Sequence, residues 1–289
     1  MNTRTKSLII MTVIYLFILT AGVFIFLRLD QFSLVPRLLI ADLSMTLITW
    51  IISLFIKNAS VYDPYWSVIP PLMVLGVIYY VNQTVSLSTF LLFIGLFVWG
   101  VRLTYNWMIG WTSFHEVDWR YNKIYEKSPK LYFLTNLFAI QLFPTLIVFI
   151  QLIAATIFIQ MQPGMNLIIW IGFLMMIFAA VIQFVSDQQM KRFKERTKNQ
   201  KVCIDEGLWK YSRHPNYFGE ITLWWGLYIM YFGAVQKIDV YIIAPILMTM
   251  LFLFISIPWM EKKILKTRPE YKDYQMNVSM LIPFFRHQK

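Results

Sequence analysis

Long apolar runs recur along the chain and are separated by short polar segments. A membrane-spanning helix needs about 20 mostly apolar residues, and the pattern predicts about eight such helices. The predicted spans lie at roughly 7–27, 37–56, 66–81, 87–110, 131–159, 165–186, 216–234 and 240–258. No Gly/Ser-rich or Pro-rich linker separates them. The sequence therefore predicts an all-α, polytopic transmembrane bundle that forms a single integral membrane domain over 1–289.

The third apolar run is short and interrupted. It begins after Asp63-Pro64, and Pro70 and Pro71 lie inside it. Proline removes a backbone N–H and clashes with the preceding turn, so we expect a kinked or broken helix near one membrane face. Irregular backbone at membrane depth lines a cavity or is buried in protein.

Composition supports a membrane protein and excludes several kinds of site. Hydrophobic residues make up 58% of the chain and charged residues 14%, whereas a soluble domain carries about 25% charged residues. With a single cysteine and three histidines, a disulfide framework is excluded and metal-ligand spacing is absent. We therefore expect no metal site.

The net charge of +11 is distributed unevenly. If the N-terminus is cytoplasmic, 22 of the 26 Lys and Arg residues fall in the segments 1–6, 57–65, 111–130, 187–215 and 259–289. Positive loops stay in the cytoplasm, so the charge is an orientation signal and predicts no nucleic-acid partner. We expect a multi-pass protein of the cell membrane that contacts lipids, with both termini and its functional site facing the cytosol.

A basic turn precedes the seventh predicted span. Pro215 suits the first position of a helix, and Arg213 beside that helix start is typical of a phosphate or carboxylate site. Tyr217, Glu220 and Trp224 share one helical face, and an ionisable group inside a span is a functional candidate. In the alternative, Arg213 anchors to lipid headgroups and pairs structurally with Glu220.

A second basic stretch follows the sixth predicted span. On a helix, Asp187, Lys191 and Lys194 would share one face. They could reach a common anionic ligand. The alternative is a juxtamembrane anchor for lipid headgroups.

The end of the fourth span carries Arg102, Tyr105 and Asn106, which lie at helical spacing from Trp99. This spacing predicts that a buried Arg102 faces the bundle, where a ligand or a carboxylate must compensate its charge. A structural ion pair is the competing interpretation.

Asp63 places a carboxylate at the inner mouth of the interrupted third span. A desolvated carboxyl group there could donate a proton or a hydrogen bond to a substrate oxygen. The alternative is a helix N-cap, a position that Asp favours.

Several of these segments belong to one recognisable pattern. The motifs are Asp63-Pro64-Tyr65-Trp66, Trp99-Gly100-Val101-Arg102-Leu103, Asp118-Trp119-Arg120-Tyr121, Gly207-Leu208-Trp209, Ser212-Arg213-His214-Pro215-Asn216-Tyr217, Gly219-Glu220, Pro269-Glu270-Tyr271, Tyr274 and Leu281-Ile282-Pro283-Phe284. Together they resemble the steroid 5-alpha-reductase family, and more closely its bacterial DUF1295 branch, over roughly residues 60–285.

The resemblance implies a membrane reductase that binds NADPH in a cytosol-facing cavity. It would reduce a carbon–carbon double bond conjugated to a carbonyl group, in a lipophilic substrate of steroid or isoprenoid type. Segments 187–215 and 259–289 would face the cofactor. From the motifs and the resemblance together, the expected cofactor-binding residues are Arg102, Asn106, Asp118, Arg120, Tyr121, Asp187, Lys191, Lys194, Arg213, His214, Asn216, Tyr217, Glu220, Tyr271 and Tyr274.

The resemblance also implies how the substrate is bound. Animal steroid reductases hold the 3-keto oxygen with a Glu and a Tyr. Here the expected catalytic counterparts are Asp63 and Tyr105.

Two other functions stay open. The Arg-His-Pro segment also resembles isoprenylcysteine carboxyl methyltransferases, which bind S-adenosylmethionine, although the many cations favour a ligand that carries several phosphates. A lipid-binding or transport protein without catalysis is the third possibility. For that class we expect inverted repeats with matching broken helices, and neither is visible.

Overall fold

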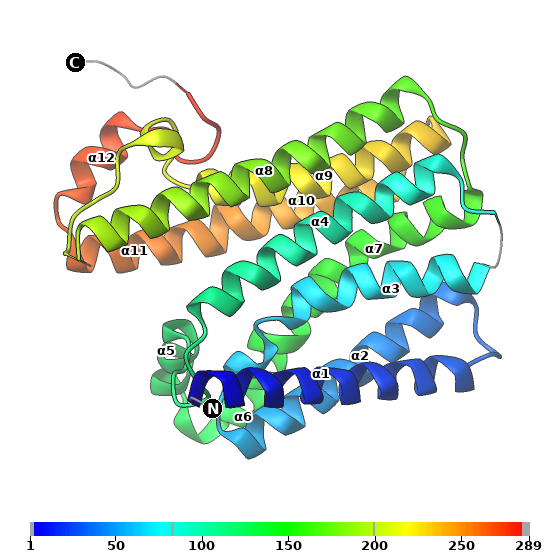
Figure 1. Cartoon of the computed structure of the whole chain (residues 1–289), viewed down its shortest axis with the longest axis horizontal. Coiled ribbons are helices and arrows are strands. Elements are labelled where there is room, and N and C mark those ends of the chain that lie inside the picture. Colours follow the sequence, from blue (N-terminus) through cyan, green and yellow to red (C-terminus); the bar gives the residue numbers. More distant parts are fainter. Residues whose placement is uncertain (1–2, 82–83, 199, 285–289) are drawn as a thin grey trace. The chain divides into compact units, whose positions relative to one another are not determined.

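The computed structural model describes residues 3–81, 84–198 and 200–284 (Figure 1). Residues 285–289 of the predicted segment 259–289 and residue 199 of segment 187–215 lie outside the described residues. The long helices are α1 (Thr3–Arg28), α2 (Leu34–Ile56), α3 (Tyr65–Val81), α4 (Leu87–Gly110), α7 (Phe143–Met161), α8 (Leu167–Arg196) and α9 (Pro215–Val235). The shorter helical elements are η1 (Ala59–Tyr62), α5 (Trp119–Lys127), η2 (Pro129–Leu131), α6 (Tyr132–Thr135), η3 (Asn136–Leu142), η4 (Gly207–Lys210), η5 (Val240–Ile242), α10 (Ile243–Leu251), η6 (Phe252–Ser256), α11 (Ile257–Thr267) and α12 (Tyr271–Asn277).

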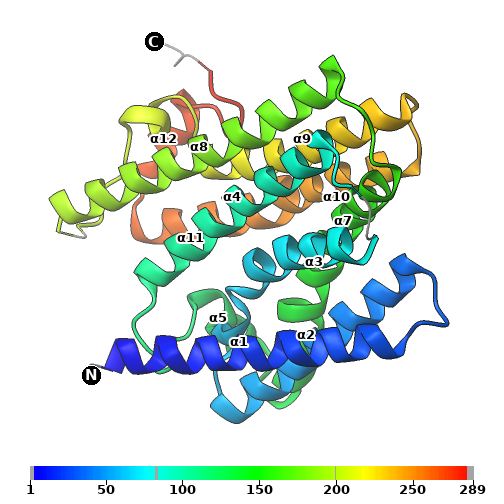
Figure 2. The ribbon, with the colours of Figure 1, turned by 45° about the vertical axis from the view of Figure 1, so that its right-hand side comes forward.

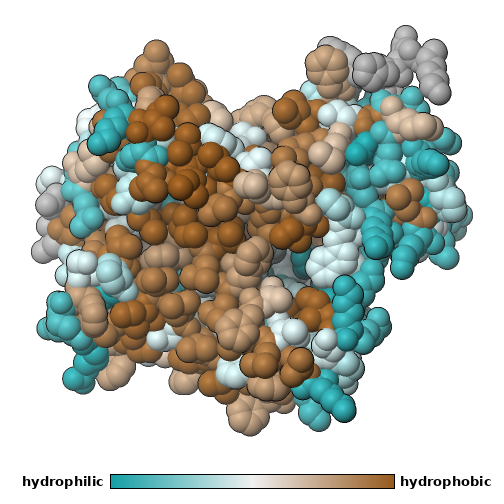
Figure 3. Space-filling model, turned by 180° about the vertical axis from the view of Figure 1, so that it is seen from behind, coloured by the Kyte–Doolittle hydropathy of each residue, from teal (hydrophilic) through white to brown (hydrophobic). Residues whose placement is uncertain are grey.

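The all-α polytopic class is confirmed. Among the described residues, seven helical segments are long and apolar enough to cross a membrane: Thr3–Arg28, Leu34–Ile56, Ala59–Val81, Leu87–Gly110, Pro129–Met161, Leu167–Arg196 and Val240–Thr267. On the face shown in Figure 3, hydrophobic side chains cover most of the surface, as expected where a protein contacts lipid.

The seventh predicted span, 216–234, does form a helix, α9, but it is not among those seven segments. Glu220 and several Trp and Tyr side chains make its sequence less apolar than that of a typical span. Both termini lie on one side of a membrane only if the number of crossings is even. Their cytoplasmic location therefore depends on α9 crossing the bilayer, and it stays a prediction.

The interruption of the third run falls elsewhere than predicted. Helix α3 continues through Pro70 and Pro71, so a break at the prolines is wrong, and the irregular step lies at Asp63-Pro64 between η1 and α3. Pro71 leaves the Ser67 carbonyl without its helical N–H. Helix α4 packs against this point, because a Cβ on Gly100 would lie 2.6 Å from the Ser67 oxygen.

Backbone contacts divide the chain into two compact units. Unit 1 is Met1–Val85 with Gly100–Gln160, and unit 2 is Ser86–Trp99 with Met161–Lys289. Because the unbroken helix α4 contributes to both units, the division does not test the prediction of a single membrane domain, which stays a prediction.

Helices α8 and α9 form the closest helix pair of unit 2 and lie side by side in both ribbon views (Figures 1 and 2). A Cβ on Gly172 would lie 2.6 Å from the Met230 nitrogen, and one on Gly226 would lie 2.8 Å from the Gly172 oxygen. Only glycine permits this backbone approach, which is common between membrane helices.

Candidate functional site

A row of polar side chains runs along one face of α2 in unit 1. Asp42, Thr46, Thr49 and Ser53 lie four, three and four residues apart, so they share one helical face. All four are buried, although most residues of α2 are apolar. Polar groups within spans face the protein interior and find partners there, so this face marks the interior of unit 1.

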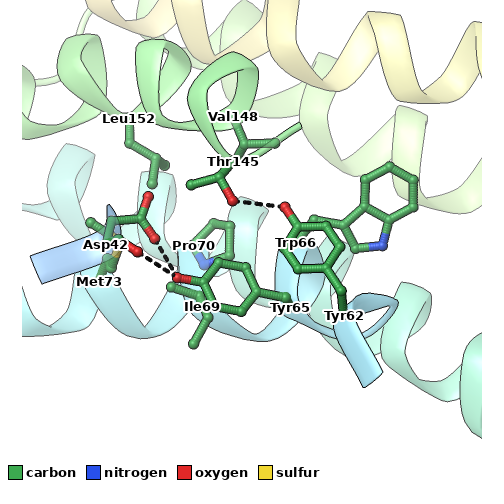
Figure 4. Close-up of a pocket in the computed structure, with 10 residues that line it drawn as sticks. All are labelled: Asp42, Tyr62, Tyr65, Trp66, Ile69, Pro70, Met73, Thr145, Val148 and Leu152. Carbon is green, nitrogen blue, oxygen red and sulfur yellow. Dashed lines mark hydrogen bonds between the residues drawn. The ribbon is translucent and has the colours of Figure 1, made fainter. Parts of the chain in front are cut away.

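The Asp42 carboxyl group begins a hydrogen-bonded network with α3, α7 and η1. Its Oδ1 accepts a hydrogen bond of 2.7 Å from the Tyr65 hydroxyl, and the Thr46 hydroxyl donates to Tyr65 at 3.2 Å. Thr46 also lies 3.1 Å from Thr145, and Thr145 lies 2.8 Å from the Tyr62 hydroxyl. Figure 4 shows the two ends of the network, at Asp42 with Tyr65 and at Thr145 with Tyr62.

This network borders a small cavity in unit 1. Its polar groups come from Asp42, Tyr62, Tyr65 and Thr145, and apolar side chains such as Ile69 complete the lining (Figure 4). The volume of this cavity is about 10 Å³, roughly the space that one water molecule needs. The cavity is too small for a dinucleotide, and its side chains would have to move to admit a substrate carbonyl group.

Asp63 lies in a second polar cluster of unit 1. The Tyr121 hydroxyl donates to its Oδ1 at 2.5 Å, and the Arg120 guanidinium acts on it electrostatically. Burial raises the pKa of Tyr121, and the negative charge of Asp63 raises it further. Tyr121 therefore stays protonated and donates its hydrogen bond to Asp63.

Asp118 holds Arg120 in this cluster. It caps the N-terminus of α5 by accepting from the Arg120 backbone N–H at 2.8 Å, and its Oδ1 also accepts from Arg120 Nε at 2.8 Å. The structure thus brings together four of the predicted site residues, Asp63, Asp118, Arg120 and Tyr121.

The three predicted site residues near the end of α4 differ in burial, and the predicted roles of Arg102, Tyr105 and Asn106 stay predictions. Arg102 is buried, as expected, whereas Tyr105 is 50% exposed and Asn106 is also exposed. Residues over the last two turns of α4 are mostly exposed or half-buried. Packing ends there, so helical spacing alone could not keep Tyr105 in the interior.

In unit 2 the Glu220 carboxylate is held by three N–H groups. Its Oε2 accepts from Gln183 at 2.5 Å and from Trp99 at 3.0 Å, and its Oε1 accepts from Trp224 at 3.0 Å. The face shared by Glu220 and Trp224 is confirmed. Arg213 does not form the structural pair with Glu220 that the alternative interpretation predicts.

Arg213 instead pairs with Glu261 of α11. The Glu261 Oε1 accepts from Arg213 Nε at 2.8 Å and lies 3.0 Å from His214 Nε2. The Tyr271 hydroxyl donates to the same oxygen at 3.1 Å, and Gln275 donates to Oε2 at 2.7 Å. We call these five residues the Glu261 cluster.

Backbone contacts also join the C-terminal residues to the segment before α9. The Arg213 N–H donates to the Ser279 oxygen at 2.8 Å, and the Phe284 N–H donates to the Tyr211 oxygen at 3.0 Å. The Tyr274 hydroxyl donates to the Trp209 carbonyl. The structure therefore gives Arg213, His214, Tyr271 and Tyr274 partners within the protein, and a direct cofactor contact for these four stays a prediction.

The remaining predicted cofactor residues are more accessible. Lys191 and Lys194 are exposed on the last turns of α8, and Asp187 is half-buried one turn earlier. Lys191 has a weak pair with Glu195, with 4.0 Å between Nζ and Oε1. At the start of α9, the half-buried Asn216 accepts from the backbone N–H of Tyr217, whose ring stacks on His214.

Sequence reasoning missed the Asp42 network as a site. The spacing of Asp42, Thr46, Thr49 and Ser53 was a usable signal, because four polar residues on one face of an apolar helix must be buried together. No comparable pattern marks Tyr65 or Thr145, which reach the network from other helices.

Comparisons with known proteins identify relatives. The family model described as "Protein of unknown function (DUF1295)" matches residues 49–278. The "Uncharacterized protein C594.04c" of Schizosaccharomyces pombe is 27% identical over an alignment of 217 residues, with a coverage of 66% of this chain and 62% of the yeast protein. The chain thus spans less than two thirds of that relative's length. No solved structure matches.

Proposed function

The chain belongs to the DUF1295 family, whose model matches most of its length, and from this premise we propose that it is a membrane-embedded, NADPH-dependent reductase. Its substrate would be a lipophilic enone of steroid or isoprenoid type. The reaction reduces the carbon–carbon double bond conjugated to the carbonyl group.

The pair of Asp42 and Tyr65 carries this proposal. A buried carboxyl group and a tyrosine, 2.7 Å apart, border a cavity of mainly apolar lining. They are the residue types that the resemblance implies for holding a keto oxygen. We assign that role to Asp42 and Tyr65 in place of Asp63 and Tyr105, because Tyr105 is 50% exposed.

The chemistry of this pair suits an enone. A hydrogen bond from the Tyr65 hydroxyl to the substrate carbonyl would stabilise the negative charge that develops on that oxygen as the double bond is reduced. With substrate bound, a protonated Asp42 would donate to the Tyr65 oxygen, which leaves the single Tyr65 hydrogen for the substrate carbonyl. The apolar lining would exclude water and strengthen the hydrogen bond. When bound, NADPH would supply the hydride to the β-carbon.

The residues of unit 2 fit NADPH in part. Lys191 and Lys194 are exposed cations suited to phosphate groups, and Asn216 and Glu220 would contact the nicotinamide or its ribose. Arg213 is already bonded to Glu261. We therefore assign to Arg213 the positioning of the α9 N-terminus and leave the phosphates to the lysines.

One observation favours the second candidate, an S-adenosylmethionine-dependent methyltransferase. Glu261 partly neutralises Arg213 and lies beside His214, so the turn before α9 is less cationic than its sequence indicates. A nearly neutral methyl donor would be tolerated there.

Titration of the detergent-purified protein with NADPH and with S-adenosylmethionine tests both candidates by calorimetry. We expect NADPH to bind, and we expect Lys191→Glu with Lys194→Glu to weaken its binding about tenfold, because two phosphate contacts would be reversed in sign. Lys237→Glu, at another exposed lysine, is the matched control. Tight binding of S-adenosylmethionine alone would overturn the reductase, and binding of neither would favour a non-enzymatic lipid-binding or transport protein.

A further inference from the structure

Four hydroxyl groups form an unbroken chain that ends at the Asp42 carboxyl group. The steps are 2.8 Å from Tyr62 to Thr145, 3.1 Å from Thr145 to Thr46, 3.2 Å from Thr46 to Tyr65 and 2.7 Å from Tyr65 to Asp42. Each distance is within or close to the range of a normal hydrogen bond. All five side chains are at most 3% exposed, so the chain is shielded along its length.

The chain can be oriented in one direction. Tyr65 donates to Asp42 and Thr46 donates to Tyr65, while either partner can donate in the contacts of Thr145. A hydroxyl group both donates and accepts, so Tyr62 can donate to Thr145 and Thr145 to Thr46. Every hydroxyl then gives its hydrogen to the next oxygen along the chain.

A buried threonine in a helix usually satisfies its hydroxyl locally, on the carbonyl four residues earlier. Thr49 does this with the Met45 carbonyl at 2.8 Å. Thr46 also lies 2.9 Å from the Asp42 carbonyl, yet its hydroxyl contacts Tyr65 and Thr145 as well. Local satisfaction does not require these further contacts, so they suggest another role.

We propose that this chain is a proton relay that delivers a proton from the Tyr62 end to the Asp42 carboxylate and so keeps Asp42 protonated in the resting protein. The proposal rests on the proposed role of the Asp42 and Tyr65 pair, which must regain any proton that it gives to the product. The cavity lining beside Asp42 is otherwise largely apolar. A relay through the protein would restore the proton without opening the cavity to bulk water.

The proton balance of the relay is closed. Tyr65 gives its proton to the Asp42 carboxylate and takes one from Thr46, and Thr46 takes one from Thr145. Thr145 takes a proton from Tyr62. Tyr62 is itself only 2% exposed, so it would take its proton from a hydronium ion that enters beside the half-buried Asp63 and leaves as water. No electrons move, and each hydroxyl ends with the hydrogen that its predecessor held.

The surroundings of Tyr62 identify the entry end. Tyr62 is the last residue of η1, and the next residue, Asp63, is only partly buried. The Asp63 carboxylate is close enough to act electrostatically on the Tyr62 phenol. A negative group at this point raises the local concentration of hydronium ions. Asp42, by contrast, lies within the apolar helix α2.

Hydrogen–deuterium exchange at Asp42 tests the relay without substrate or nucleotide. The purified protein is transferred to D2O, and the carboxylic acid C=O infrared band of Asp42, assigned by its loss in Asp42→Asn, is followed as it shifts on deuteration. We expect Thr145→Val to slow this shift by about tenfold or more, because one hydroxyl link is removed and its buried neighbours lose a partner. Thr46→Val should act alike, and Thr145→Ser should restore the wild-type rate.

Thr49→Val is the matched control. Thr49 is as buried as Thr46 and lies on the same face of α2, but it is outside the chain. Its replacement should leave the exchange rate within about twofold, since only a local hydrogen bond is lost. An unchanged rate in Thr145→Val, an equal slowing in Thr49→Val or the absence of the Asp42 band in the wild type would overturn the relay. Because no ligand is present, failure here is distinct from failure to bind NADPH.

Discussion

A carboxyl group of each unit, the buried Asp42 in unit 1 and the half-buried Glu220 in unit 2, has different hydrogen-bond partners. In unit 1, Asp42 ends a chain of hydroxyl groups, which can both donate and accept. In unit 2, Glu220 is surrounded by Trp and Gln N–H groups, which only donate. Donors alone stabilise a fixed negative charge, whereas hydroxyls can exchange protons with the acid. In our proposals the carboxyl group of Asp42 therefore takes part in proton transfer, whereas that of Glu220 stays charged and contacts the nicotinamide or its ribose.

The largest expected effect lies in the Glu261 cluster. Glu261→Ala would leave the Arg213 guanidinium, whose side chain is 11% exposed, without its carboxylate partner. Removing one member of a buried ion pair costs about 3 to 5 kcal/mol. We expect a large loss of thermal stability in detergent.

Glu206→Ala is the control for that experiment, because its pair with Arg196 is 47% and 62% exposed. An exposed pair contributes about 0 to 1 kcal/mol. Equal losses from the two substitutions would show that the Glu261 cluster is not the positioning device that we infer.

The next effect separates catalysis from cofactor binding. Tyr65→Phe removes the hydroxyl that donates to Asp42 and, in our proposal, to the substrate carbonyl. Loss of such a donor lowers kcat by about 100- to 1,000-fold. NADPH affinity should be unchanged when measured by calorimetry. A parallel loss of affinity would place Tyr65 at the cofactor and contradict the proposed role.

A third experiment replaces the carboxyl group of Glu220 or of Asp42 with an amide and compares the loss of stability. In Glu220→Gln the new NH2 group would face an N–H donor of Trp99, Trp224 or Gln183. A contact between donor and acceptor then becomes one between two donors, at a cost of about 1 to 3 kcal/mol. In Asp42→Asn the neighbouring hydroxyls can reorient. We expect thermal unfolding in detergent to show a smaller loss of stability for Asp42→Asn than for Glu220→Gln. A larger loss for Asp42→Asn would contradict the difference that we draw between hydroxyl and N–H partners.

The smallest effect concerns the single cysteine of unit 2. Burial raises the pKa of the Cys203 thiol, and the nearby Glu270 carboxylate raises it further. Less thiolate is then present at pH 8, so alkylation should be slow and should accelerate as pH rises. We expect Glu270→Gln to lower the thiol pKa and speed alkylation at pH 8 by about two- to threefold at low salt. The rate with a maleimide reagent measures this, and no change would mean that burial alone sets the pKa.

The apolar spans could be predicted from the sequence because each depends on a local run of residues. Helix α9 was also found, although its Glu220 and aromatic residues make it a weak span. The exact place of the interruption in the third run was missed. The free-energy cost of a proline in a helix depends on what packs against the carbonyl that loses its N–H partner. Here that carbonyl belongs to Ser67, and α4 packs against it at Gly100.

The sites were harder to predict because their partners are distant in sequence. Arg213 and Glu220 were recognised as special, but Glu261 lies 48 residues after Arg213 and no local signal links them. Asp42 and Thr145 are joined only through Thr46 and the packing of α2 on α7. Helical spacing shows which residues share a face of a helix, but it does not show which other elements that face packs against.

The contact between Arg213 and the C-terminal residues has a consequence for biosynthesis. The Val278 carbonyl, which accepts from Arg213, lies 65 residues later in the chain. At about 5 to 20 residues per second of translation, the segment before α9 leaves the ribosome several seconds before its partners do. During that interval the arginine has neither its carboxylate nor its carbonyl acceptors. The nascent protein therefore completes the contacts of the turn before α9 among the last steps of synthesis. A ribosome stalled just beyond α9 would hold a chain in which the contacts of Arg213 with Glu261 and Val278 have not yet formed.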